Sequence, residues 1–294
     1  MRHYITYLLL FSWSLLHAYE LVVNGVYIGI LGPHFAFVTN RGLDSPEPSY
    51  SGDVVVPDQV TYKGRVYDVT SVGDNAFTGC DGLTSVQLPS KVTAISPCAF
   101  LGCTSLRSVN SPQNLIVICN TAFTACTSLQ QISLPRHQEI VDSMTFYCCA
   151  SLTSLILPHR IRTICCTAMQ HLSSLTDLYC FSSEPPLAEV GAFTIADQKK
   201  CTLHVPKETL SKYQEMQVWR DFYNIVPLED EEYEKEGYQR GDINDDGKID
   251  DKDLNLLRLI IVSLPDDSAV RWAADINEDG IVNAKDYVLL AKLI

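Results

Sequence analysis

The feature that most restricts the fold of this chain is a 23-residue repeat that fills its middle. One column of the repeat is large and apolar: Phe77, Phe100, Phe123, Phe146 and Met169. A second column is mostly cysteine: Cys80, Cys103, Cys126, Cys149 and Leu172. A third column is leucine throughout: Leu83, Leu106, Leu129, Leu152 and Leu175. Columns that keep their register over five units predict a solenoid, in which each unit is one rung and stacks the same side chain on its neighbour.

The repeat consensus, AFxGCxSLxSVxLPxxVxxI, resembles the BspA-like leucine-rich repeats of bacterial surface proteins. The flanks are similar to that family as well, because YELVVNGVYIGI and SYSGDVVVPDQVTYKGRVYDVTSV resemble its N-terminal β segments, with NG and KG as hairpin turns. The segment CTLHVPKETLSKYQEMQVWRDFYNIVPL resembles its closing strand and helix. The resemblance implies a mainly β leucine-rich-repeat solenoid with a cap at each end. We expect the N-terminal cap at residues 19–68, the repeats at 69–181 and the C-terminal cap at 182–228.

The N-terminus, MRHYITYLLLFSWSLLHAYE, has the pattern of a secretory signal peptide, with a short basic start, an apolar run and Ala18 before polar sequence. We expect residues 1–18 to be removed. The apolar run is too short to favour a membrane span, and no second stretch near 20 residues follows it. The sequence therefore predicts a secreted, extracellular protein without membrane insertion after signal removal, held at a cell surface only through a partner.

The charge of the chain is concentrated at one end. From residue 227 onward there are 18 acidic residues against 8 basic ones, so that this end accounts for most of the net charge of −13. Part of it lies in EDEEYEKEGYQR, which we interpret as an acidic linker at residues 229–240. The chain shows no basic stripe and no interleaving of aromatic and basic residues, so a nucleic-acid partner is not expected.

Two segments near the C-terminus have the spacing of calcium loops. Such a loop takes side-chain oxygens from positions 1, 3, 5, 9 and 12 and a carbonyl from position 7, with Gly at position 6 for the turn. In the first loop the ligands are Asp242, Asn244, Asp246, Lys248 through its carbonyl, Asp250 and Asp253. In the second they are Asp275, Asn277, Asp279, Ile281 through its carbonyl, Asn283 and Asp286. The spacing predicts two Ca²⁺ sites.

Each loop runs into an apolar helix, predicted at 253–262 and 286–294, and position 8 of each loop (Ile249, Val282) is expected to pair through a short β bridge. No entering helix is expected before either loop, and Asp stands at position 12 where the EF-hand has Glu. This duplicated pattern resembles a type I dockerin, a small all-α module, over residues 241–294. The resemblance implies calcium-dependent binding to a cohesin module on a partner or scaffold protein, as in cellulosome-like assemblies that degrade polysaccharides. Because such a module has little core, metal binding and folding should be coupled.

Each predicted helix carries more apolar residues than one packed face needs, which leaves a second stripe for a partner. In the family, loop positions 10 and 11 help to choose the cohesin. The predicted cohesin contacts are Asp251, Lys252, Leu256, Leu259, Ala284, Lys285, Leu289 and Leu293. The alternative is that the extra leucines pack on the repeat domain.

All eleven cysteines lie between residues 80 and 201. In a secreted chain they could form disulfides, since neighbouring rungs are about 4.8 Å apart. Four of them occupy a repeat column where buried apolar residues are expected, which favours a ladder of reduced core thiols.

The exposed strand face of the repeats is small and polar and offers a single carboxylate, Asp177, whereas glycoside hydrolysis needs a pair. We therefore expect a non-catalytic binding protein. Its candidate contacts with a protein or glycan ligand are Ile156 and Tyr179. Two alternatives remain: a free adhesin whose calcium module stabilises the C-terminus, and a dockerin-borne enzyme of polysaccharide degradation.

Overall fold

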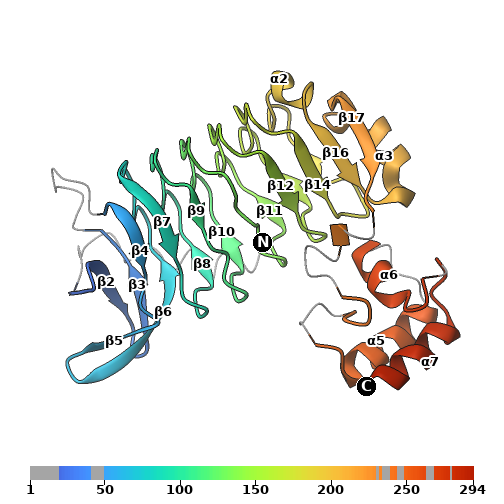
Figure 1. Cartoon of the computed structure of the whole chain (residues 1–294), viewed down its shortest axis with the longest axis horizontal. Helices are drawn as coiled ribbons and strands as arrows, with labels where there is room; N and C mark the ends of the chain where they lie inside the picture. The colour runs from blue at the N-terminus through green and yellow to red at the C-terminus, as the bar shows by residue number, and fades with distance from the viewer. Residues whose placement is uncertain are drawn as a thin grey trace.

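The computed structural model describes residues 20–40, 50–229, 232–233, 239–243, 248–262, 268–278 and 280–294. The predicted signal peptide lies outside these residues. Figure 1 shows the strands following one another along a curved solenoid, from blue at one end to yellow at the other, with a group of orange and red helices beyond its last rungs. Within the described part of the chain, no helix is long and apolar enough to cross a membrane.

The solenoid begins with hairpins. β1 pairs with β2 and β5 with β6, both antiparallel, while β3 joins β2 to the parallel part of the sheet. The turns are Asn24-Gly25 and Lys63-Gly64, where all four residues have positive φ, as a two-residue hairpin turn requires. Both predicted hairpin turns are confirmed. The bounds are β1 Leu21–Val23, β2 Val26–Leu31, β3 Phe35–Val38, β5 Gln59–Tyr62 and β6 Arg65–Val72.

The rungs that follow contribute short parallel strands to two rows. One row consists of β4 Gly52–Val55, β7 Leu83–Gln87, β9 Ser108–Val109, β12 Ser154–Leu157, β14 Asp177–Cys180, β16 Thr202–Val205 and β17 Asn224–Pro227. The opposite row continues from β6 with β8 Ala94–Ile95, β10 Val117–Ile118, β11 Ile140–Val141, β13 Thr163–Ile164 and β15 Leu187–Ala188. Residues one repeat apart are direct partners, as in Leu155↔Leu178 and Val72↔Ile95. The 23-residue period is therefore the register of the solenoid.

The repeat columns form the core. Phe77, Phe100, Phe123 and Phe146 are completely buried, and their rings stack with centroid separations of 4.8, 5.0 and 6.0 Å. The cysteine column lies beside them, because the Cys103 thiol donates to the carbonyl of Phe77 at 3.0 Å and the pattern repeats in the next two rungs. The eleven cysteines, all within the described residues, are present as thiols.

The last rung is closed by α2 Ile195–Gln198, a 3₁₀ turn at Lys207–Thr209, α3 Leu210–Glu215 and a second 3₁₀ turn at Trp219–Asp221. Tyr213 and Trp219 are completely buried. Each has a polar atom that needs a partner. The Tyr213 hydroxyl donates to the carbonyl of Ser182 at 3.0 Å, and the Trp219 indole to that of Pro186 at 2.7 Å. The two rings therefore seal the apolar end of the solenoid without leaving a buried donor unsatisfied.

The C-terminal module contains α5 Asp251–Val262, α6 Ser268–Ala274 and α7 Ala284–Leu293. α5 and α7 follow the two loops, as predicted. The expectation that no helix precedes the second loop is wrong: α6 does so, because Ala269, Trp272, Ala273 and Ala274 give it one continuous buried face. Among the described residues no β bridge joins Ile249 to Val282, and both side chains pack instead on the module's apolar core.

Candidate functional site

The two loops of the C-terminal module end in equivalent buried carboxylates. Asp253 lies in the first turn of α5 and Asp286 in the first turn of α7, and both are 0% exposed. Asp253 accepts hydrogen bonds from the amides of Ile243 at 2.8 Å and Asp250 at 2.9 Å, which are loop positions 2 and 9. Each carboxylate oxygen takes one of these bonds, so the residue ties the start of the loop to its end.

The second loop repeats this geometry. Asp286 accepts hydrogen bonds from the amides of Ile276 at 3.0 Å and Asn283 at 2.8 Å, again positions 2 and 9, and a longer one from Asn277 at 3.3 Å. None of the described lysine, arginine or histidine side chains forms an ion pair with it. A buried carboxylate is costly without a cation or equivalent compensation. This observation, together with an all-oxygen donor set, fits a hard divalent cation such as Ca²⁺.

The remaining predicted ligands are partly described. Asp242 is buried, and the carboxylate of Asp275 accepts a hydrogen bond from the amide of Gly280 at 2.8 Å. The carbonyl of Ile281 accepts one from the side chain of Asn283 at 2.8 Å, and Lys248 is exposed. Three further ligands, Asn244, Asp246 and Asp279, lie outside the described residues. Within the described ones, no group of three His, Cys, Asp or Glu side chains could hold a metal by itself.

Loop position 9 also starts each helix. Asp250 accepts from the amide of Lys252 at 2.8 Å, and Asn283 accepts from that of Lys285 at 2.9 Å. In α7 the N-cap Asn283 and Asp286 form a capping box. Residues predicted to bind metal therefore also cap the helices. We expect each loop and the first turn of the helix that follows it to become ordered together.

An arginine that no sequence pattern indicated links the two loops. Arg240, just before the first loop, donates from Nη1 to the carbonyls of Trp272 at 3.0 Å and Asp275 at 2.8 Å. Its guanidinium also lies 4.4 Å from the centre of the Trp272 ring. The next amide, that of Gly241, donates to the carbonyl of Ala273 at 2.7 Å. These contacts cap the C-terminus of α6 and join the entrance of the first loop to that of the second.

The predicted cohesin contacts differ in exposure. Loop positions 10 and 11 are exposed in both units: Asp251, Lys252, Ala284 and Lys285. Leu256 and Leu289 are half-buried, and the side chain of Leu259 lies outside the described set. α7 exposes Val288 (52%) and Leu293 (62%), whereas the residue of α5 equivalent to Val288 is the polar Asn255. Among the side chains that the structure describes, α7 thus exposes the more apolar outer face of the two.

The candidate ligand residues of the solenoid lie at its C-terminal end. Ile156 and Tyr179 are half-buried and pack against an apolar cluster that includes residues of the C-terminal module. The Tyr179 ring stacks on His204 with a centroid separation of 4.3 Å. This part of the sheet face is therefore partly covered by the protein's own C-terminal residues.

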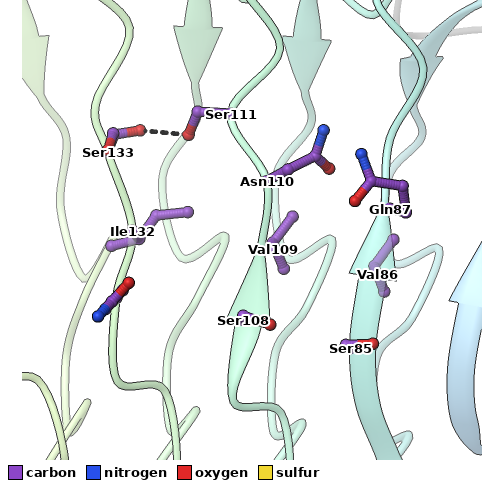
Figure 2. A pocket seen from close by; sticks show the side chains of 10 residues that line it. Ser85, Val86, Gln87, Ser108, Val109, Asn110, Ser111, Ile132 and Ser133 are labelled. Atoms are coloured by element: carbon purple, nitrogen blue, oxygen red, sulfur yellow. Dashed lines mark hydrogen bonds between the residues drawn. The ribbon is translucent and has the colours of Figure 1, made fainter.

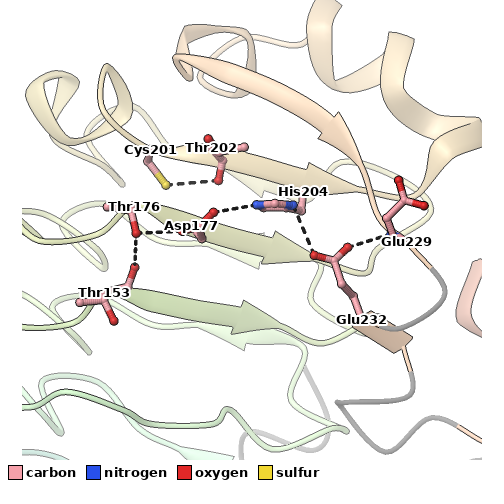
Figure 3. Close-up of polar contacts among 8 residues, drawn as sticks. All are labelled: Thr153, Thr176, Asp177, Cys201, Thr202, His204, Glu229 and Glu232. Atoms are coloured by element: carbon pink, nitrogen blue, oxygen red, sulfur yellow. Dashed lines mark hydrogen bonds and ion pairs between the residues drawn. The ribbon is translucent and has the colours of Figure 1, made fainter.

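Among the described residues, His204 belongs to a group of ionisable side chains that resembles a catalytic arrangement (Figure 3). Its Nε2 is 2.9 Å from Asp177, and its Nδ1 is 3.5 Å from Glu232. A general base needs one ring nitrogen for the proton it removes. Here both nitrogens face carboxylates. The nearby Cys201 is buried, which raises the pKa of its thiol to about 12, so it is no nucleophile at neutral pH.

The rungs before this cluster carry a shallow groove on the sheet face (Figure 2). Its volume is about 340 Å³, and its lining has no charged side chain: Ser85, Val86, Gln87, Ser108, Val109, Asn110, Ser111, Gln131, Ile132 and Ser133. The side chain of Asn110 accepts a hydrogen bond from the amide of Leu88 at 2.6 Å and donates one to its carbonyl at 2.9 Å, so it stabilises the contact between neighbouring rungs. Gln87 and Gln131 are exposed, and their side chains form no hydrogen bond to the described residues, although the carbonyl of Gln87 accepts one from the amide of Val56 at 3.0 Å.

Comparisons with known proteins agree with this geometry. Residues 67–190 match the model of the BspA type leucine rich repeat region in 6 copies, and residues 240–294 match that of the dockerin type I domain. No curated protein matches the chain.

Several solved structures are similar to the solenoid. They include a T. pallidum leucine rich repeat protein (24% identity, 71% of this chain and 83% of that one, TM-score 0.48). A leucine-rich repeat protein from Bacteroides ovatus has 17% identity, with 71% and 77% covered and a TM-score of 0.39. A leucine rich cell surface protein from Faecalibacterium prausnitzii has 15% identity, with 73% and 96% covered and a TM-score of 0.37.

Proposed function

Because the chain carries a BspA-type leucine-rich repeat region at 67–190 and a type I dockerin domain at 240–294, we propose that it is a secreted, non-catalytic binding protein. Its dockerin attaches it to a cohesin module of a partner or scaffold protein in a calcium-dependent way. The setting is extracellular, in a cellulosome-like assembly, and the solenoid supplies a second binding surface. The domain division remains the one expected from the sequence, with the repeats at 69–181 and the dockerin at 241–294.

The observation that carries the proposal is the matched pair of buried carboxylates, Asp253 and Asp286. Each closes a loop of oxygen donors and starts an apolar helix. Calcium bound in such a loop acts as a structural cross-link between oxygens and supplies no catalytic step. Two loops of one geometry support two sites per chain.

The partner surface is proposed on the outer face of the module. Loop positions 10 and 11 are exposed in both units, and α7 adds the exposed apolar side chains Val288 and Leu293. Exposed apolar side chains rimmed by polar ones are typical of protein–protein interfaces. We assign the main apolar contact to α7, because the matching positions of α5 are polar or turned inward.

The ligand surface of the solenoid is proposed on the groove around Gln87 and Gln131, which no other part of the described chain covers. Ile156 and Tyr179 can take part only where the C-terminal cluster leaves them accessible. A groove lined by hydroxyl and amide groups suits a neutral ligand that forms many hydrogen bonds, either a glycan or a polar protein surface.

The test is direct binding between the chain, residues 19–294, and a panel of purified type I cohesin modules, measured by surface plasmon resonance. We expect a cohesin that binds in calcium at about 2 mM, just above the weakest dissociation constants of extracellular calcium loops, and dissociates when EGTA is added. Binding that persists in EGTA would contradict the calcium-dependent part of the proposal.

A further inference from the structure

The repeat solenoid and the dockerin share one apolar cluster. Its buried members come from the last rungs (Phe181, Leu228), from the segment between the domains (Tyr233) and from the dockerin, where they are Ile243, Leu257, Ile260, Ala269, Trp272, Ala273, Ala274 and Leu290. A loose acidic spacer would leave the two domains with separate cores. The shared cluster indicates instead that the dockerin is docked onto the solenoid.

Three aromatic rings form the centre of this contact. Phe181 directly follows β14, and its ring meets that of Tyr233 edge to face, with centroids 5.0 Å apart. Tyr233 in turn stacks on Trp272 of α6, with centroids 5.2 Å apart and planes 9° from parallel. All three side chains are buried. Aromatic pairs in these geometries stabilise a contact beyond the effect of the apolar area that they bury.

Ion pairs and a hydrogen bond lie next to the rings. Glu232 reaches His204 of β16, which also faces Asp177 of β14, so that one imidazole connects the segment between the domains to two strands of the solenoid (Figure 3). The second oxygen of Glu232 accepts a hydrogen bond from the amide of Glu229 at 2.8 Å, which links Glu232, the neighbour of Tyr233, to the residues just after β17. The described residues of this segment are thus held in place on the sheet.

Trp272 is linked through Arg240 to the start of the second proposed calcium loop. Arg240 binds the carbonyls of Trp272 and Asp275, and Asp275 is the first predicted ligand of that loop. The amide of Ile276, the residue after Asp275, donates a hydrogen bond to Asp286. The first and last predicted ligands of the loop are connected in this way. The end of α6, which carries the ring that contacts Tyr233, is therefore connected through Arg240 and Asp275 to that loop.

We propose that Phe181, Tyr233 and Trp272 form a calcium-dependent latch that docks the dockerin on the last rungs of the solenoid. With the loop filled, the latch is closed, and the face around Ile156 and Tyr179 is partly covered. When calcium is removed, α6 loses its anchor, the latch opens and that face becomes accessible. The calcium dependence rests on the proposed metal sites, whereas the docking itself rests on the contacts above.

The test is hydroxyl-radical footprinting of residues 19–294 in calcium and in EGTA, with side-chain oxidation followed by mass spectrometry. We expect the oxidation rates of Tyr179 and Trp272 to rise several-fold in EGTA. Two internal controls should not change: Tyr223, which is 72% exposed, and Tyr213, which is completely buried in the solenoid cap. A rise at Tyr213 would mean that the solenoid itself unfolds, and would overturn the latch as the cause.

Tyr233→Ala separates the latch from the metal sites. The variant should bind calcium with unchanged stoichiometry in a calorimetric titration, yet show in calcium the oxidation rates of Tyr179 and Trp272 that the parent protein shows in EGTA. Glu232→Gln, which keeps all three rings, should give a smaller change in the same direction. If calcium binds but these rates are the same in all proteins and conditions, the latch is wrong while the proposed function stands. If no calcium binds, the proposed metal sites fail, and the response to Tyr233→Ala decides the docking alone.

Discussion

Asp253 and Asp286, 33 positions apart, occupy equivalent places in their loops. Each is completely buried, and its carboxylate accepts hydrogen bonds from the backbone amides of the second and ninth residues of its own loop. The match extends to the helix that each of them starts. A carboxylate withdrawn from water in this way, twice in one small module, is best explained by a cation that neutralises it. The pair therefore connects the repeat in the sequence to the proposed binding of two calcium ions.

Replacing either carboxylate should remove one calcium site. We expect Asp253→Ala and Asp286→Ala each to lower the stoichiometry from two ions to one in isothermal titration calorimetry, and the double variant to bind none. Each change also removes the carboxylate that accepts hydrogen bonds from two backbone amides at Asp253 and from three at Asp286, so the helical circular dichroism of the module should fall. Asp251→Ala, at an exposed loop position that is no predicted ligand, is the matched control and should keep both sites. Unchanged stoichiometry in the double variant would refute the assignment.

The apolar face of α7 should dominate cohesin binding. Val288→Asp places a charge among exposed apolar side chains, and we expect the dissociation constant to rise at least tenfold, or about 1.4 kcal/mol. The equivalent change on α5, Asn255→Asp, lies on a polar face and should have little effect. Surface plasmon resonance on a cohesin identified as a partner measures both. A larger loss of cohesin affinity for Asn255→Asp than for Val288→Asp would mean that α5, and not α7, makes the main contact.

The phenylalanine column should control the stability of the solenoid. Phe123 is completely buried between Phe100 and Phe146, so Phe123→Ala removes two ring contacts and leaves a cavity. The expected loss in the free energy of unfolding is about 3–5 kcal/mol. Phe35→Ala, at a half-exposed site in β3, serves as the control and should cost much less. Denaturant unfolding followed by circular dichroism gives both values, and equal losses would argue against the stacked column.

The cysteines should differ sharply in reactivity. Burial raises the pKa of the Cys119 and Cys201 thiols to about 12, and it also raises that of Cys149. Only the thiolate is alkylated, so these three should resist iodoacetamide at pH 8 in the folded protein. Cys166 is the exposed cysteine and should react first. In denaturant all eleven should react, and mass spectrometry counts the labels. Failure to label all eleven in denaturant without reductant would reveal disulfides.

The carboxyl group of Asp74 should give a pH-dependent contribution to stability. Burial raises its pKa above the ordinary value, so the folded state holds this proton more tightly than the unfolded state does. Its contribution to the stability is therefore most favourable at low pH and is lost as the pH rises through the raised pKa.

Asp74→Asn removes the charged form, and the variant should melt at a higher temperature than the parent at pH 7. The gain should shrink at pH values below the ordinary pKa of aspartate, about 3.9. Differential scanning calorimetry of both proteins at the two pH values measures the difference. A lower melting temperature for the variant at pH 7 would mean that the charged carboxylate is needed.

The regular parts of the fold could be predicted because their information is local or periodic. The 23-residue columns predict which residues become strand partners, as with Leu155 and Leu178, and Asn24-Gly25 alone indicates a hairpin turn. The two loops proposed to bind calcium are also local patterns, since the predicted ligands of each lie within twelve residues. α6 was missed because seven residues carry too little periodic signal, although Trp272 among three alanines marks a buried face.

The docking of the two domains could not be predicted from patterns of this kind. Phe181, Tyr233 and Trp272 are far apart in the chain, and no spacing rule connects them. The single signal is Tyr233 within a run of acidic residues, an aromatic side chain that a solvated spacer does not need. The same contact explains why Ile156 and Tyr179, which stand out in the sequence as ligand candidates, lie partly under the C-terminal cluster.

The most direct test of the account is calcium-dependent capture of a cohesin protein. Residues 19–294 are immobilised and exposed to the secreted and surface fractions of the producing organism, in calcium or in EGTA, beside the Asp253→Ala/Asp286→Ala double variant. The account predicts that mass spectrometry finds a protein with a cohesin module on the parent chain in calcium only. The same set of bound proteins under all three conditions, or a calcium-dependent set without any cohesin module, would contradict it.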